Sequence, residues 1–172
     1  MPEFAVICDN DASTDAVRDS LWRLVGQNSL CSMATVGEDE VRPHINTCFF
    51  AASNQLDLIV FTSPLSRHGR YLAAGSSVAI SVFDSHQEWG GTIFGAQFFG
   101  AGGLCHGGEA DEVLAVYASR HPRMSEWAKT AEDIEKKFES RMYRFRIAEF
   151  TLLDEQTFGK EGYVSGSIVR TT

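Results

Sequence analysis

The spacing of hydrophobic positions changes at Gly26, from a helical pattern before it to a strand pattern after it. Up to Gly26 the apolar residues recur every three or four positions, at Val17, Leu21, Leu24 and Val25. This is the spacing of one face of an amphipathic helix. Ser13 can cap the start of such a helix, and Gly26 ends the apolar run. The pattern predicts an N-terminal helix over residues 13–26.

After Gly26 the apolar runs are short, rich in Val, Ile, Phe and Thr, and separated by turn residues, which is typical of strands. We expect strands near 30–36, 41–51, 56–61, 78–83, 93–104 and 143–147. The connections 37–40 and 53–55 are short enough for antiparallel hairpins. Apolar and basic residues alternate from Tyr143 to Ile147, so this strand has one core face and one face open to solvent or a ligand.

Helical patterns interrupt the strands. A short helix is expected over 66–74, where Gly75 ends it, and two longer helices are expected over 109–120 and 125–140. The tail from Thr157 onward is rich in Gly and Ser, and we expect it to be loosely held or to depend on a partner.

These elements predict a mainly β fold, a Greek-key-like barrel of about six antiparallel strands with flanking helices. We expect one domain over 1–172, with the barrel at about 29–105 and 141–153 and a helical excursion at about 109–140. A chain of 172 residues, of which 44% are hydrophobic, buries a core without disulfides or a structural metal.

Charge, hydropathy and cysteine content exclude several classes of partner and ligand. The chain has 23 acidic and 15 basic side chains, a net charge of -8, so nucleic acid would be repelled and is not an expected partner. No apolar stretch approaches the roughly 20 residues of a membrane span, and the N-terminus lacks the basic region of a signal peptide. The four cysteines have no zinc-like spacing. We expect a cytoplasmic protein with reduced, inert thiols, no metal and no membrane association.

One segment, Thr62 to His68, carries the chemistry of a phosphate site. Its hydroxyl and basic side chains lie between the end of an apolar strand and the start of a helix. The backbone N–H groups at a helix N-terminus, together with Thr, Ser and Arg side chains, are donors for a bound anion. The alternative is that Ser66 only caps the helix, while Arg67, His68 and Arg70 are solvated.

Three segments in this chain order resemble the FMN-binding split barrels related to pyridoxamine 5'-phosphate oxidase. They are Val41-Arg42-Pro43-His44-Ile45, then Thr62-Ser63-Pro64-Leu65-Ser66-Arg67-His68-Gly69-Arg70-Tyr71-Leu72, then Gly95-Ala96-Gln97-Phe98-Phe99-Gly100. The C-terminal stretch from Tyr143 to Asp154 is similar to that of a small bacterial branch of the family whose substrate is uncertain.

The resemblance implies FMN as cofactor. Thr62, Ser66, Arg67 and His68 would surround its phosphate, Gln97 would hydrogen-bond the isoalloxazine, and Asn46 and Thr47 would lie near the flavin edge. The full set of candidate cofactor-binding residues is Arg42, Asn46, Thr47, Thr62, Ser63, Ser66, Arg67, His68 and Gln97. No catalytic side chain is identified.

Two departures from the family qualify the expected function. Better-known oxidases have a cationic residue at the position of Asn46 and often lysine at that of His68, so phosphate affinity here should depend more on pH. No basic, histidine-containing signature follows Thr151, so we do not expect oxidation of pyridoxamine phosphate itself.

The expected function is an FMN-dependent oxidoreductase that meets a small-molecule substrate or electron donor. By analogy with the family we expect a homodimer with the cofactor site at the interface. The alternative is a binding protein of the same fold that holds haem or another flavin-like ligand without turnover.

Several weaker signals receive structural interpretations. The glycines of 100–103 and 107–108 lack the strand, helix and acidic residue of a dinucleotide fingerprint, and bulges or turns at a barrel corner explain them. His44, His86 and His106 are taken as ordinary histidines and not as convergent haem or metal ligands. Trp89 either covers a ligand or closes the end of the barrel, and we expect the latter.

Overall fold

The computed structural model describes residues 2–36, 42–160 and 162–170. Its strands are β1 Phe4–Cys8, β2 Leu30–Thr35, β3 His44–Phe49, β4 Ala51–Ala52, β5 Leu58–Thr62, β6 Ser77–Phe83, β7 Phe94–Leu104, β8 Arg141–Asp154 and β9 Tyr163–Arg170. Its helices are α1 Thr14–Gln27, α2 Arg67–Ala73, α3 Gly107–Arg120, α4 Met124–Trp127, α5 Ala131–Phe138 and α6 Glu155–Phe158.

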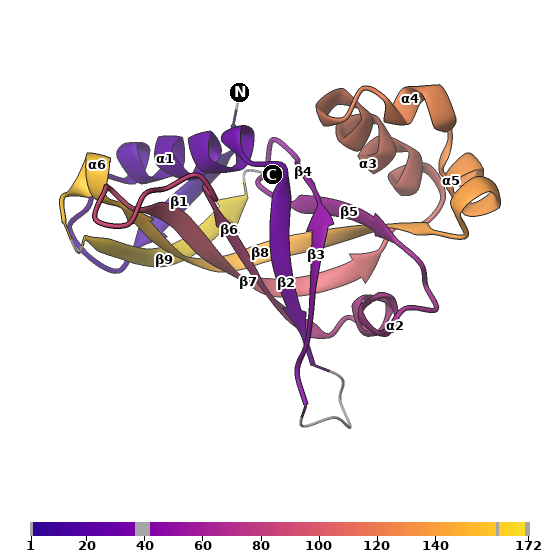
Figure 1. Cartoon of the computed structure of the whole chain (residues 1–172), viewed down its shortest axis with the longest axis horizontal. Coiled ribbons are helices and arrows are strands. Elements are labelled where there is room, and N and C mark those ends of the chain that lie inside the picture. The colour runs from indigo at the N-terminus through magenta and orange to yellow at the C-terminus, as the bar shows by residue number, and fades with distance from the viewer. Residues whose placement is uncertain (1, 37–41, 161, 171–172) are drawn as a thin grey trace.

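The strands form one antiparallel sheet that curls into a split barrel (Figure 1). Hydrogen bonding follows the order β1-β9-β8-β7-β6-β2-β3, and β5 pairs with both β4 and β8. Because β3 and β4 are separated only by Phe50, the chain passes from the β2 side of the barrel to the β5 side at this residue. The sequence prediction of a mainly β barrel with flanking helices is confirmed, although the sheet is not fully closed.

The long strand β8 organises the sheet. Its first half pairs with β5, and its second half pairs with β9, while β7 runs along its other edge. The barrel and its extension by β9 and β1 therefore share one strand, which crosses the width of the molecule in Figure 1.

Two apolar clusters hold the layers together. The larger fills the barrel and reaches α1, whose Val17, Leu21 and Leu24 are fully buried against the inner face of the sheet. Ser13 caps this helix by accepting a hydrogen bond from the Ala16 N–H at 3.4 Å. The smaller cluster lies between α3 to α5 and the strands β4, β5 and β8, on the side opposite the barrel interior.

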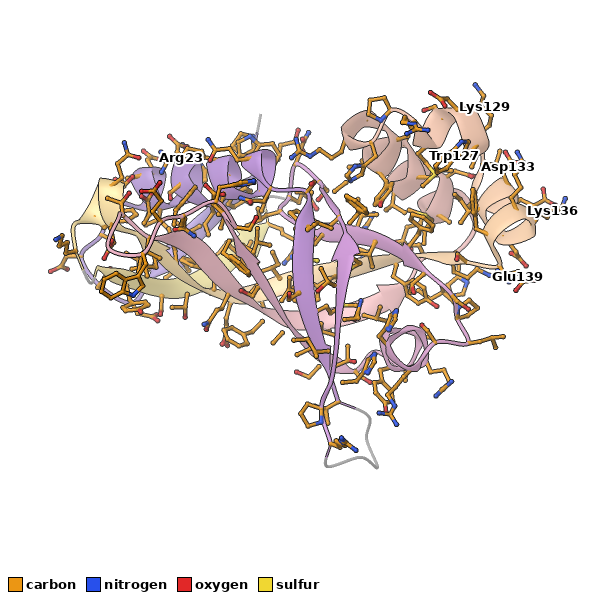
Figure 2. The ribbon with its side chains drawn as sticks, in the orientation of Figure 1. Arg23, Trp127, Lys129, Asp133, Lys136 and Glu139 are labelled. Carbon is orange, nitrogen blue, oxygen red and sulfur yellow. The ribbon has the colours of Figure 1, made fainter. Side chains whose placement is uncertain are left out.

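The helix expected over 125–140 is wrong, because two helices stand there. Thr130 begins α5 with a capping box, in which its hydroxyl accepts from the Asp133 N–H while the Asp133 carboxylate accepts from the Thr130 N–H. Such a cap fixes extended backbone before a helix and so separates α5 from α4. Lys129, Asp133, Lys136 and Glu139 project away from the sheet (Figure 2).

The expectation of a loosely held tail is also wrong. Residues 163–170 form β9, which pairs with β8 on one edge and with β1 on the other. β1 was not expected at all. The Gly and Ser residues of β9 serve close packing, since a Cβ at Gly166 would lie only 2.1 Å from the Ile7 carbonyl oxygen.

Glycine also marks the barrel corner on β7. The pairing of β7 with β8 shifts register between Phe99 and Gly100, and a Cβ at Gly100 would lie 2.0 Å from the Arg146 carbonyl oxygen. A bulge therefore accounts for the glycine-rich run, as the sequence indicated. The expected hairpin turn 37–40 and the start of the strand at Val41 lie outside the described residues.

Within residues 2–36, 42–160 and 162–170, no helix combines the length and the apolar character needed to span a lipid bilayer.

Candidate functional site

The start of α2 is a compact turn held by serine hydroxyls. The Ser66 Oγ accepts from the Gly69 N–H at 3.0 Å and donates to the Ser63 carbonyl oxygen at 2.7 Å. Gly69 is buried in this turn, where a Cβ would lie 2.2 Å from the same Ser63 oxygen. Ser66 is thus an ordinary N-cap. Helix geometry leaves the N–H of His68, near the start of α2, without an intrahelical partner.

His68 joins α2 to two strands. Its Nε2 lies 2.7 Å from the Thr62 Oγ1 at the end of β5, and its Nδ1 lies 3.2 Å from the His44 Nε2 at the start of β3. The two imidazole rings are nearly coplanar, with an angle of 2° between them. Burial lowers the pKa of His68 from its ordinary value, and the neighbouring His44 lowers it further.

The Thr62, His68 and His44 chain has two ways to arrange its protons. The Thr62 hydroxyl can donate to His68 Nε2 while His68 Nδ1–H donates to His44 Nε2, or both bonds can run in the opposite direction. In each arrangement the facing nitrogens of the two imidazoles share one proton. A further proton gives the pair one positive charge beside the start of α2, so the chain can exchange a proton there without losing either hydrogen bond.

Of the expected cationic residues, Arg67 lies best for a ligand at this turn. It is the first residue of α2 and is exposed. Arg70, by contrast, donates from Nη1 to the Leu65 carbonyl oxygen at 2.6 Å and so holds the loop before the helix. Arg42 is exposed and lies two residues before β3.

The remaining expected contacts, Thr47 and Gln97, lie in one row across the outer face of the sheet. Directly paired residues place polar side chains on six neighbouring strands in this row: Thr47, Ser32, Ser81, Gln97, Thr151 and Ser165. Directly opposed residues of antiparallel strands face the same side. The hydroxyls at each end of the row are close, at 3.4 Å for Ser32 and Thr47 and at 3.1 Å for Thr151 and Ser165.

Apolar side chains border this polar row on both sides. Those beside it that are partly exposed are Leu30, Phe49, Phe83 and Tyr163 on one side and Ile45 and Phe99 on the other. Among the described residues no helix covers this face, whereas α1 covers the inner face (Figure 1).

The structure separates the expected site into two parts. Asn46 faces the barrel interior, where its Oδ1 is buried without a hydrogen-bond partner, and Thr47 faces outward. Gln97 lies five residues along β7 from Gly102, about 17 Å along an extended strand, and Gly102 packs against Leu72 of α2 from the inner face. One chain therefore presents the α2 turn and the Gln97 row as separate surfaces.

Two hollows adjoin the outer face at the end nearest Phe83. One, of about 700 Å³, is lined by Leu30, Thr47 and Phe83 together with His86 and its neighbours. The other, of about 220 Å³, is lined by Gln97, Phe83 and Tyr163 among others. Trp89, in the loop between β6 and β7, is fully exposed, so the expectation that it closes the barrel end is wrong for this chain.

The sequence did not identify His44 as a partner of His68. His44 and His86 were weighed together, but β6 places them at opposite ends of the sheet. His44 pairs with Thr35, which is opposite Val78 at the start of β6, whereas His86 follows the end of that strand. Among the described residues no group of three or more His, Cys, Asp or Glu side chains is placed to hold a metal ion.

Solved structures share this fold at low sequence identity. A haem-binding protein from Mycobacterium smegmatis superposes with a TM-score of 0.70 at 12% identity over 92% of this chain, and this chain spans only 60% of that protein. An FAD- and haem-binding protein from the same organism gives 0.64 at 19% identity, covering 90% of this chain and 82% of that one. General Stress Protein 26 from Bacillus anthracis gives 0.61 at 11% identity, with 90% and 98% covered.

These likenesses show the fold alone. No curated protein matches the sequence. The family model described as pyridoxamine 5'-phosphate oxidase matches residues 17–154, which include most of α1, the barrel and the helical excursion. The chain belongs to the pyridoxamine 5'-phosphate oxidase family.

Proposed function

We propose that the chain binds FMN and acts as an FMN-dependent oxidoreductase. The observation that carries the proposal is the turn at the start of α2, where Thr62, Ser66 and His68 lie together at the N-terminus of the helix. Arg67 adds an exposed guanidinium at the same turn. A guanidinium, a hydroxyl and a histidine that can take up a proton are groups that can bind a phosphate monoester.

The tight turn supports the fit. Glycine at position 69 lets the backbone of Ser63 close over the helix start, so the hydroxyls and N–H groups gather on one side. At this turn His68 can act as a second cation when its imidazole takes up a proton. We therefore propose that phosphate binding and protonation of His68 support each other.

The flat isoalloxazine ring would lie against the outer face of the sheet. The polar row through Thr47 and Gln97 supplies hydrogen-bonding groups, and the apolar side chains on both sides of it supply contact area. Gln97 lies on the outer face, whereas Gly102, about 17 Å from it along β7, packs against Leu72 of α2 from the inner face. We propose that a second copy of the chain brings its own outer face to the first, so that the cofactor lies between the two.

The flavin supplies the redox chemistry, and no side-chain acid or base is required for it. The protein binds the phosphate, orients the ring and leaves one face open to a small-molecule substrate or electron donor. We do not propose pyridoxamine phosphate, because the basic C-terminal signature that would bind it is absent after Thr151. The four cysteines are free thiols, which supports a reducing, cytoplasmic setting.

Haem is the second candidate, and His86 is the observation that favours it. Its Nδ1 lies 3.2 Å from the Asp84 Oδ1, an arrangement that orients an imidazole so that Nε2 is available as a ligand. The ring borders the 700 Å³ hollow next to Phe83. A haem bound there would need neither Arg67 nor His68.

Absorption spectra of the purified protein separate these candidates. After addition of FMN and removal of free ligand, we expect retained flavin bands that a reductant bleaches and air restores. The Arg67→Ala variant should lose about tenfold or more in FMN affinity through the lost charge-assisted bond, whereas Arg123→Ala, on the helical excursion, should bind as the parent does. No retained flavin, or a Soret band with haem that His86→Ala abolishes, would overturn the FMN proposal.

A further inference from the structure

Two of the four cysteines lie side by side on neighbouring strands. Cys31 on β2 and Cys48 on β3 are direct cross-strand partners, and their sulfur atoms are 3.7 Å apart. Direct partners in antiparallel strands have Cα atoms about 4.5 to 5.5 Å apart, which is within the range that a disulfide spans. A bond of about 2.05 Å between the sulfurs therefore needs side-chain rotation but no shift in strand register.

The two thiols differ in their surroundings. Cys31 is 2% exposed, whereas Cys48 is only half-buried. The hydrogen bond with Cys31 lowers the pKa of Cys48; burial opposes this, and the Asn46 side chain acts in the same direction as the hydrogen bond. The same interaction, together with burial, raises the pKa of Cys31. A thiolate in this pair therefore forms on the more accessible sulfur.

The other two cysteines lack this arrangement. Cys105 lies in the smaller apolar cluster beneath α3, where burial raises its pKa to about 11. Cys8 lies on β1, opposite Gly166 of β9, and burial raises its pKa as well. Neither should react as Cys48 does, which makes both of them internal controls.

We propose that Cys31 and Cys48 form a reversible disulfide site that responds to hydroperoxides. The Cys48 thiolate attacks one peroxide oxygen, the O–O bond breaks, and Cys48 becomes a sulfenic acid while the other oxygen leaves as water or an alcohol after taking a proton. The Cys31 sulfur then attacks the Cys48 sulfur, and the S–O bond breaks with release of water. Two thiols lose two electrons in total, the peroxide gains them, and a dithiol reductant reverses the change.

The disulfide would restrain β3, the strand that carries the candidate ligand contacts Asn46 and Thr47. β3 ends the hydrogen-bonded path of the sheet, and Cys48 directly follows Asn46 and Thr47 in it. A bond to Cys31 would fasten this edge strand to β2 one residue before the end of β3. We expect the oxidised chain to melt at a temperature higher by on the order of 5–10 °C, as a cross-link closing a short loop predicts.

The test uses the full wild-type chain, first reduced and then treated with a small excess of hydrogen peroxide. The intact mass should fall by two hydrogen atoms, and the number of titratable thiols should fall from the four of the sequence by one pair. Combined digestion after Arg, Lys and Glu separates the two cysteines, since Glu38 and Glu40 lie between them. The linked peptides should be 24–38 and 41–67, and reduction should release them.

Single variants identify the roles. In Cys31→Ser, oxidation should stop at a sulfenic acid on Cys48 that a dimedone-type reagent traps, whereas Cys48→Ser should show neither product. Cys8→Ser and Cys105→Ser should cross-link as the wild type does. The proposal is overturned if the wild-type digest has no 24–38 to 41–67 link, or if Cys105 is oxidised as fast as Cys48. The wild-type digest decides the matter even if a variant fails to fold.

Discussion

The Nε2 of His44 lies 3.2 Å from the Nδ1 of His68, and the second ring nitrogen of His68 contacts the Thr62 hydroxyl at 2.7 Å. These contacts join the end of β5, the first turn of α2 and the start of β3. Each of the three side chains can donate or accept a proton. The imidazole of His68 is therefore held from both of its ring nitrogens.

Removing His44 should raise the pKa of His68. In the wild type, burial and the His44 ring both hold this pKa below its ordinary value. In His44→Ala the repulsion between two charged imidazoles is absent, so His68 should titrate closer to about 6.5. NMR titration of the imidazole C–H signals measures both proteins. An unchanged His68 midpoint would contradict the role assigned to His44.

FMN affinity should rise as the pH falls from about 8 to 6.5. A bound phosphate favours the charged imidazole, so the pKa of His68 is higher in the complex than in the free protein, and binding takes up a proton. We expect an increase in affinity of about tenfold across this range. Riboflavin, which has no phosphate, and the His68→Gln variant with FMN should both give flat profiles in titrations of flavin fluorescence. A sloping riboflavin profile would place the pH effect elsewhere.

Gly69→Ala should disrupt the start of α2. Its new methyl group would lie 2.2 Å from the Ser63 carbonyl oxygen and 2.8 Å from the Ser66 Oγ, so the turn must open, at a cost of about 1–3 kcal/mol. FMN binding should be lost with it. The matched control is Gly26→Ala in α1, where nothing lies within 4 Å of the added Cβ and helix propensity predicts a gain of about 0.5–1 kcal/mol. Chemical denaturation compares the two, and equal effects would refute the crowding argument.

Neighbouring residues of β3 should differ in their effect on the flavin. Thr47 shares the outer row with Gln97, but Asn46 faces the barrel interior. Thr47→Ala and Gln97→Ala should each weaken flavin binding by about threefold to tenfold through a lost hydrogen bond and shift its absorption bands. Asn46→Ala should leave the bands in place. If only Asn46→Ala shifted them, the ring would have to lie on the inner face.

Asp154 should contribute to stability above its ordinary pKa and lose that contribution in acid. The carboxylate is 1% exposed and accepts from the Ser20 hydroxyl at 2.6 Å and the Thr157 hydroxyl at 2.7 Å. Although burial opposes the charge, these bonds and Arg23 lower its pKa in the folded state. Its stabilisation is then complete above about pH 4 and declines as the pH falls through the folded-state pKa.

The variant Asp154→Asn tests this contribution. It should lose about 2 kcal/mol of unfolding free energy at neutral pH and show a weaker decline between about pH 4 and pH 2 than the wild type. Urea denaturation at several pH values gives both quantities. Parallel pH profiles for the two proteins would exclude Asp154 as the responsible group.

The sequence predicted those parts of the fold and site that are local. The first helix was expected over 13–26 and lies at Thr14–Gln27, because its apolar period and its cap are contained in one stretch. The helix start at Ser66 was found in the same way. Its cap and its buried glycine all lie within a few residues of one another.

The strands and contacts that the sequence did not predict depend on pairing between residues far apart in the chain. The two strands missed, β1 and β9, are short or rich in small residues. Among the described strands β1 pairs with β9 alone, and β9 pairs with β1 and β8. The pairing of His44 with His68 depends on where β3 meets α2. The polar row depends on the register of six strands, and a shift of one residue would turn Thr47 inward and Asn46 outward.

The pairing of β1 with β9 sets an order for folding during synthesis. Phe4 of β1 lies opposite Arg170 of β9, so β1 cannot pair in the sheet until β9, which is made later, is available. The barrel and α1 can collapse earlier, because their contacts close over shorter stretches of chain. Until β9 has been made, the second half of β8 is an exposed edge, and a ribosome-bound intermediate would be vulnerable to association there.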